Sequence, residues 1–297
     1  MTGKSRQILR TRRRGPGHVL RFAAPAASTS AVIRLLCLLL VGALALGCGA
    51  SQATSVSPQH YQENARRAYA EALEQFEDHD WENATSMFEQ VKRQYAYTRY
   101  ARLAELRLAD IAYAQDNYAE SVTGYRSFAH DHPNDPLVAY ARFRICKALF
   151  EQSGETILLP PQEERDLASA LDAFTAMKAF LNDFPMNDGV PEVTYMLEVI
   201  SGLLARHELY VAHFYLKQGH FEAAAARCRY ELEHYRDSGL SAEALVLLGE
   251  TYLKMHRRNE AREAFLNVLS AYPDSAFTVV ARRFLRQTGL LVSSTAE

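Results

Sequence analysis

Small and large apolar residues recur at fixed distances along most of this chain. Counted from Arg258 as an anchor, the frame runs Ala261 at +3, Phe265 at +7, Tyr272 at +14 and Pro273 at +15. The same spacing at +3, +7 and +14 begins at four earlier anchors, which are Trp81, Tyr118, Ala170 and Phe221, and a proline at +15 follows two of them, as Pro133 and Pro185. Helical amphipathicity explains the residues at +3 and +7, but it does not explain the aromatic residue or the proline that follow. The pattern therefore predicts a repeated helix that ends at the same point in each copy.

The spacing of the anchors identifies the kind of repeat. Successive anchors are 37, 52, 51 and 37 residues apart. Tetratricopeptide units have a period of about 34 residues and pair two antiparallel helices, with small residues at the close crossing and large residues filling the gap. The longer middle units then carry insertions. We predict an all-α fold, a tetratricopeptide-repeat solenoid of five helix pairs with a C-terminal capping helix that covers the last apolar face.

The predicted repeat domain covers residues 59–289. Its helices are expected at 61–76, 81–94, 101–114, 118–129, 136–150, 165–182, 192–218, 221–235, 241–255, 260–270 and 277–286. A connection rich in aromatic residues, Tyr95–Tyr100, joins the first two pairs. The segment Gly154–Pro161 predicts an elaborated loop in the third unit. Residues 290–297 are expected to form a loose tail.

The start of the chain has the features of an export signal. Leu35–Leu46 is an apolar run of 12 residues that follows Arg34 and precedes Gly47-Cys48. This run is too short to span a bilayer as a helix. Its length and flanks indicate a secretory signal over residues 1–47. The segment before Arg34 is longer than the basic region of such a signal needs to be. The cysteine after Gly47 makes it resemble a bacterial lipoprotein signal, with Cys48 as the lipid attachment site and residues 48–58 as a flexible tether. The alternative is ordinary cleavage near Cys48, which would yield an unlipidated periplasmic protein.

Charge and motif content exclude several classes of function. Residues 1–47 hold eight basic and no acidic side chains, which leaves 25 Lys+Arg against 35 Asp+Glu in the remainder. Such an acidic body lacks the basic surface that nucleic acid requires. No glycine-rich phosphate loop is present, and His207 and His213 are six residues apart, not the four that bring two imidazoles to one helix face for zinc. We predict no cofactor, no metal and no catalysis, and we expect Cys146 and Cys228 to be free thiols in the core.

Together, the signal, the cysteine, the tether and the five units resemble the BamD family (also called YfiO or ComL), lipoproteins of the outer-membrane β-barrel assembly machinery. The resemblance covers about residues 61–287. It rests on these positions: Trp81, Ala84, Gln94-Tyr95, Tyr100, Val211-Ala212, Tyr215, Gly219, Phe221 and Arg227. The aromatic connection departs from the family, because Ala96, Tyr97 and Thr98-Arg99 replace its Pro, Phe and Gly-Pro.

The resemblance implies a non-catalytic scaffold at the periplasmic face of the outer membrane. In the family, the C-terminal units dock on the membrane-proximal POTRA domain of the barrel subunit BamA, beside other lipoproteins, and an N-terminal groove receives unfolded outer-membrane proteins. It further implies that Arg227 contacts BamA, with a solvated surface charge as the alternative. Tyr97 and Tyr100 are candidates for the substrate groove, with packing between repeats as the alternative.

Two other functions fit parts of the sequence. One is another envelope lipoprotein with the same repeats, such as a pilus-assembly pilotin or a cell-division coordinator. The other is an envelope enzyme with a site across the groove, which would show a cluster of perturbed titratable groups lining one pocket. Five units with a long helix at 192–218 fit the assembly scaffold better than a pilotin.

Overall fold

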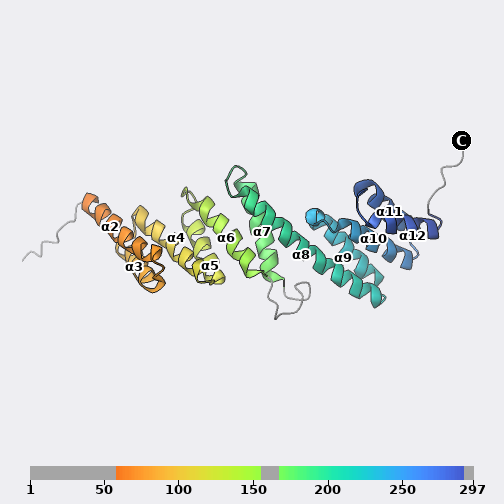
Figure 1. The fold of residues 1–297 in the computed structure, drawn as a ribbon, viewed down its shortest axis with the longest axis horizontal. Helices are drawn as coiled ribbons and strands as arrows, with labels where there is room; N and C mark the ends of the chain where they lie inside the picture. Colours follow the sequence, from red (N-terminus) through yellow and green to blue (C-terminus); the bar gives the residue numbers. More distant parts are fainter. Residues whose placement is uncertain (1–57, 155–166, 291–297) are drawn as a thin grey trace, which may run out of the picture. The chain divides into compact units, whose positions relative to one another are not determined.

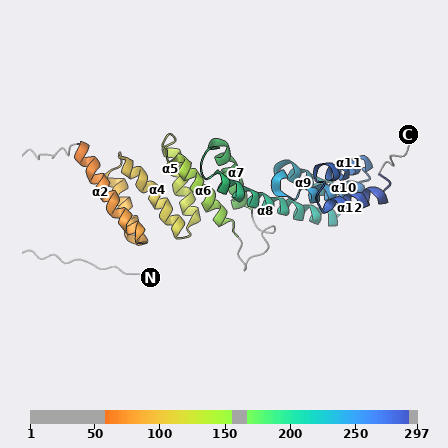
Figure 2. The ribbon, with the colours of Figure 1, turned by 45° about the horizontal axis from the view of Figure 1, so that its top comes forward.

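The computed structural model describes residues 58–154 and 167–290, and in these two ranges every regular element is helical. Within these ranges, eleven α-helices follow one another in chain order (Figures 1 and 2). They form these pairs: α2 (Pro58–Glu77) with α3 (Trp81–Gln94), α4 (Arg99–Ala114) with α5 (Tyr118–Asp131), α6 (Val138–Gln152) with α7 (Ala168–Asp183), α8 (Val190–Lys217) with α9 (Phe221–His234), and α10 (Ser241–Lys254) with α11 (Arg258–Ala271). A short 3-10 turn, η2 (Arg236–Ser238), follows α9, and α12 (Phe277–Gln287) packs on α10 and α11. The predicted tetratricopeptide architecture of five pairs and a cap is confirmed.

The repeated frame forms the core of each pair. The +3 residues are all fully buried, namely Ala84, Ser121, Ala173, Ala224 and Ala261. The +7 residues are fully buried as well, namely Phe88, Tyr125, Met177, Cys228 and Phe265. The +14 residue caps the second helix of each pair, as where the Tyr95 N–H donates to the Val91 carbonyl at 2.9 Å. Small side chains therefore allow the close crossing, large ones fill the space beside it, and the helix ends where the frame predicts.

The turn inside a pair uses a left-handed backbone position. It lies two residues before the anchor, at His79, Asp116, Gly219 and His256, with φ between 59° and 78°. In the first unit the Asp80 N–H donates to the Gln75 carbonyl at 2.9 Å and the His79 N–H to that of Phe76 at 3.1 Å. These two bonds satisfy carbonyls at the helix end. Only Gly219 adopts this φ without a steric cost from Cβ.

First helices of neighbouring pairs also contact one another, as α2 does with α4, α6 with α8, and α8 with α10. This contact between successive units is what stabilises a solenoid. Cys146 on α6 and Cys228 on α9 are free and buried in the core, and burial raises the pKa of both thiols to about 12, as expected for inert core cysteines. None of the described helices is both long and apolar enough to cross a bilayer.

Several predicted helix starts differ from the observed ones by two or three residues, and the difference at α4 bears on a candidate site. The aromatic connection ends at Thr98, and α4 begins at Arg99, so Tyr100 lies in a helix. The Thr98 hydroxyl accepts a hydrogen bond from the Ala101 N–H at 3.2 Å, which caps the helix two residues earlier than we predicted. Of the predicted loop Gly154–Pro161 only Gly154 falls within the described residues, and the signal, Cys48 and the tail after Leu290 lie outside them.

Candidate partner-binding surfaces

Arg227 lies on α9 and is held by a carboxylate of the neighbouring helix. Its Nη1 is 3.1 Å from Glu208 Oε2 and 3.4 Å from Glu208 Oε1. Glu208, on α8, is buried, whereas the Arg227 side chain is 43% exposed. Both contacts use Nη1 alone. The ion pair thus fixes the direction of the guanidinium while much of it stays accessible to a partner.

Two aromatic rings continue the same face of α9. Tyr230 and His234 follow Arg227 at +3 and +7, which are positions on one side of a helix. Tyr230 is 40% exposed, and its ring stacks on His234 with centroids 4.0 Å apart. We call Arg227, Tyr230 and His234 the α9 face. Exposed Arg and Tyr on a rigid helix are the residue types that contribute most to protein interfaces.

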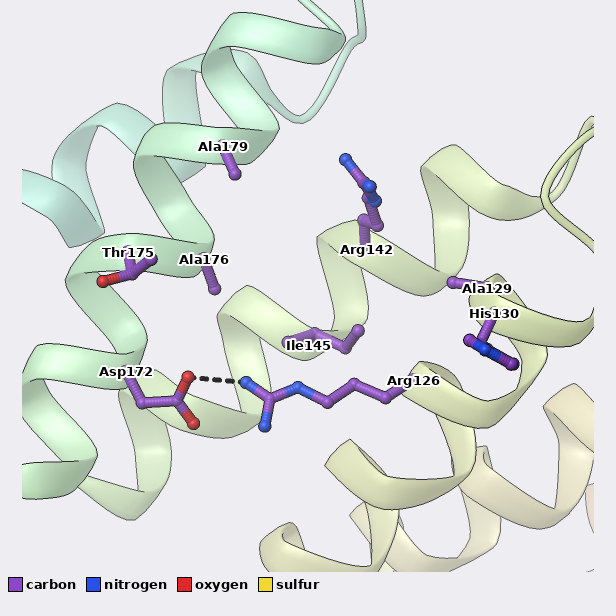
Figure 3. A pocket seen from close by; sticks show the side chains of 9 residues that line it. All are labelled: Arg126, Ala129, His130, Arg142, Ile145, Asp172, Thr175, Ala176 and Ala179. Atoms are coloured by element: carbon purple, nitrogen blue, oxygen red, sulfur yellow. Dashed lines mark hydrogen bonds and ion pairs between the residues drawn. The ribbon is translucent and has the colours of Figure 1, made fainter.

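A pocket of about 370 Å³ opens between α5, α6 and α7 (Figure 3). Ile145, Ala176 and Ala179 supply its apolar lining. Arg126 reaches across from α5, and its Nη2 donates to Asp172 Oδ1 on α7 at 2.6 Å. Apolar walls with charged groups at the rim suit one or two side chains of an extended peptide. We call this the α5–α7 pocket; no motif in the sequence indicated it, because its residues come from three helices.

Tyr97 and Tyr100 have different surroundings. Tyr97, in the loop between α3 and α4, is 94% exposed. The Tyr100 ring lies 5.8 Å from that of Tyr69 on α2, and the Arg99 guanidinium lies 5.2 Å from the Tyr100 centroid. Tyr100 therefore packs between the first two units, while Tyr97 projects into solvent.

A buried polar cluster lies between the second and third units. Asp110 on α4 accepts hydrogen bonds from the Tyr125 hydroxyl and, at 2.7 Å, from the Tyr140 hydroxyl. Arg107 Nη1 donates to Asp110 Oδ2 at 2.8 Å, and Arg144 Nε lies 3.6 Å from Oδ1, the oxygen that both tyrosines contact. Burial and the nearby carboxylate raise the pKa of Tyr140 to about 12 and raise that of Tyr125 as well, so both phenols stay neutral donors. This is the kind of perturbed cluster that an enzyme site would show, yet its members satisfy one another and join α4, α5 and α6.

Another buried carboxylate, that of Glu231 on α9, is fully inaccessible to solvent. Its Oε1 accepts hydrogen bonds from the hydroxyls of Ser238 at 3.0 Å and Ser241 at 3.2 Å. Its Oε2 has no hydrogen-bond partner within the described part of the chain. Burial raises the pKa of Glu231 above its ordinary value, and the charge of Glu243 adds to this effect. Folding therefore favours the protonated acid.

Glu231→Gln should change the pH dependence of stability. Because the folded pKa lies above the unfolded one, this group stabilises the fold at low pH, and that stability is lost as pH rises through the folded pKa. The neutral amide should therefore stabilise the protein at neutral pH and lose this advantage in acid. Denaturation midpoints measured from about pH 4 to about pH 8 check this. Exposed Glu233→Gln on the same helix is the control, and an identical profile for both variants would contradict the assignment.

No group of three or more His, Cys, Asp or Glu side chains in residues 58–154 and 167–290 is arranged to hold a metal ion. His132 packs at its +14 position, with its ring 5.1 Å from that of Phe128 and Nε2 3.0 Å from Glu105. The α9 face and the α5–α7 pocket are accessible features of the kind that bind other proteins. Stacked helix pairs with such surfaces define a tetratricopeptide-repeat binding protein.

The chain belongs to the YfiO family, described as "Outer membrane lipoprotein", whose model matches residues 61–267. It is 25% identical over 251 residues to the outer membrane protein assembly factor BamD of Caulobacter vibrioides, covering 84% of this chain and 80% of that protein. It is 24% identical to BamD of Haemophilus influenzae, covering 84% and 94%. Among solved structures, the TPR2AB domain of yeast Sti1 with pHSP90 matches with a TM-score of 0.40 and 9% identity, over 76% of this chain and 84% of that one. The resemblance found in the sequence is confirmed.

Proposed function

We propose that this protein is a scaffold subunit of the machinery that assembles β-barrel proteins in the outer membrane. A lipid on Cys48 holds it at the periplasmic face, where it binds a POTRA domain of BamA, other lipoproteins of the machinery and unfolded barrel precursors. Family membership supports this role, as do relatives described as outer membrane protein assembly factors. The mechanism is positional, since the scaffold brings precursor and barrel subunit together and makes or breaks no bond.

The observation that carries the BamA contact is the presentation of Arg227. Holding Nη1 on Glu208 orders the guanidinium before a partner arrives, which reduces the entropy lost on binding. A planar guanidinium can then pair bidentately with a carboxylate of the partner, while Tyr230 supplies apolar contact area. The α9 face is therefore the proposed BamA surface.

For the precursor we propose the α5–α7 pocket. Unfolded barrel strands alternate apolar and polar side chains, so an apolar side chain can enter between Ile145 and Ala176 while polar neighbours meet the rim. Arg126 and Asp172 offer both signs of charge there, which suits many sequences and no particular one. Tyr100 keeps its packing role between the first two units.

Arg227→Gln should weaken BamA binding about tenfold or more, since a central Arg at an interface contributes about 2 kcal/mol. The Gln substitution is preferable to Glu, because a second carboxylate near buried Glu208 would disturb folding. The measurement is titration of the purified full-length protein with the BamA POTRA region.

The exposed Arg282 on α12 offers a matched control. Arg282→Gln should bind BamA as the wild type does. Both variants should keep the helical content of the wild type at the temperature of the titration, although Arg227→Gln loses some stability because Glu208 is left without its partner. Equal affinity of Arg227→Gln and Arg282→Gln for BamA would show that Arg227 is a solvated surface charge that takes no part in this contact. Other residues would then have to bind BamA.

A further inference from the structure

Three loops and the start of α2 lie on one edge of the first three units. Side-chain contacts tie each loop to the helix that begins beside it. The Tyr61 hydroxyl, in the first turn of α2, donates to the Gln94 carbonyl at the end of α3 at 2.8 Å. Arg102 near the start of α4 pairs with Asp135 in the next loop at 2.8 Å. Arg142 near the start of α6 pairs with Asp183 at the end of α7.

We call this edge, formed by the first turn of α2 and the loops 95–98, 132–137 and 184–189, the N-terminal edge. Because successive helices run in opposite directions, every connection from one pair to the next returns to it. The turns inside the pairs, at His79 and Asp116, lie at the opposite edge. The array therefore has two edges, and the described chain begins at only one of them.

Two apolar side chains project from the N-terminal edge. Tyr97 is 94% exposed and Met186 is 93% exposed, far more than any other large hydrophobic residue in the described ranges. Both lie at +16 from their anchors, and the equivalent loop residues of the other units are Asn134, Asp237 and Asp274. An apolar side chain so fully exposed is unfavourable in water, whereas the polar equivalents are not. The side chains of Tyr97 and Met186 at the tips of these loops are therefore suited to an environment less polar than water.

The position of the lipid site indicates which environment that is. Described structure begins at Pro58 on the N-terminal edge, and Cys48 is ten residues earlier. Ten residues span at most about 35 Å, so a lipid on Cys48 keeps the start of α2, which lies on this edge, within about 35 Å of the bilayer surface. Tyr is enriched at that interface, where its ring sits among headgroups. Charge along the edge is mixed, since Arg99 lies near Tyr97 while Asp188 lies near Met186. Contact with the membrane would therefore depend on insertion of the two apolar side chains more than on attraction to charged headgroups.

We propose that the N-terminal edge rests on the membrane surface, with Tyr97 and Met186 inserted at the boundary between headgroups and acyl chains. The proposal rests on the lipid anchor of the proposed function. With a tether at one point and two inserted tips, the first three units are held in one orientation to the bilayer. Single side chains on separate loops fit a deformable lipid surface better than the preformed pocket of a protein.

Photo-crosslinking of the full-length protein in its own envelopes tests this. The photoreactive residue p-benzoylphenylalanine replaces Tyr97 or Met186 in two variants, and the exposed Asp78 or Gln115 at the opposite edge in two controls. After illumination, mass spectrometry of the purified protein measures phospholipid adducts. We expect lipid adducts at 97 and 186 to exceed those of the controls by at least about fivefold, because only interfacial side chains meet acyl chains.

Three results would overturn the inference: adducts to another protein or to a second copy at 97 and 186, adducts to a barrel precursor there, or equal lipid yields at both edges. Cys48→Ala separates this inference from the anchor. Release of that variant from membranes, with lipid adducts in the wild type, supports both. If membrane attachment depends on Cys48 but the wild type gives no lipid adducts, the lipid anchor is supported and the membrane contact of the N-terminal edge is overturned. Lipid adducts that persist in Cys48→Ala would contradict the lipid anchor but support the membrane contact of the N-terminal edge.

Discussion

Asp110→Ala is expected to lower the free energy of unfolding by about 3–5 kcal/mol, because removing one member of a buried ionic cluster leaves the other charges uncompensated. Asp110 is only 4% exposed. It accepts hydrogen bonds from Tyr125 and Tyr140 and pairs with Arg107 at 2.8 Å. These partners belong to α4, α5 and α6, so the loss would weaken the second unit, the third unit and the contact between them.

Chemical denaturation followed by circular dichroism measures the effect. The matched control is Asp172→Ala, which removes a carboxylate that also pairs with an arginine, Arg126 at 2.6 Å, but is 42% exposed. Exposed pairs contribute about 0–1 kcal/mol, so this variant should stay close to the wild type. If Asp110→Ala costs no more than Asp172→Ala, the cluster does not hold the units together.

Gly249→Ala is expected to destabilise the fifth unit by about 1–3 kcal/mol, the usual cost of overpacking a core. A Cβ at Gly249 on α10 would lie 2.6 Å from the ring of Phe265 on α11. Phe265 cannot easily give way, because it is fully buried and stacks on Phe284 of the capping helix with centroids 5.1 Å apart. The clash therefore outweighs the gain of about 1 kcal/mol that alanine normally brings to a helix interior.

Two variants make this prediction specific. Gly202 lies inside α8, and a Cβ there would meet nothing closer than Arg206 Nη1 at 3.7 Å, so Gly202→Ala should stabilise the protein. In the Phe265→Leu background the ring is gone, and Gly249→Ala should cost clearly less than in the wild type. Thermal unfolding of the four members of this cycle measures the coupling. An equal cost in both backgrounds would show that the ring does not require a glycine at 249.

The helix pairs could be predicted because their signal is local. The residues at +3, +7 and +14 lie within one helix and its cap, so their spacing in sequence is their spacing in space. The start of α4 was missed although a capping residue, Thr98, was present, because the aromatic run around it was interpreted as a loop. Local capping chemistry decided that boundary.

The candidate sites were predicted less completely, since they depend on contacts between helices. The resemblance indicated Arg227 but gave no sign of Glu208, which is 19 residues earlier on another helix. The cluster around Asp110 and the α5–α7 pocket each combine side chains of three helices. Tyr97 and Tyr100 were grouped by sequence, yet one is exposed and the other packs on Tyr69.

The central claim is tested most directly by native co-purification of the full-length protein from detergent-solubilised envelopes, with its partners identified by mass spectrometry. The proposed scaffold role predicts BamA at near-equal abundance, together with other lipoproteins of the assembly machinery. Pilus-assembly or cell-division components without BamA would contradict it, and would assign these repeats to a different envelope complex.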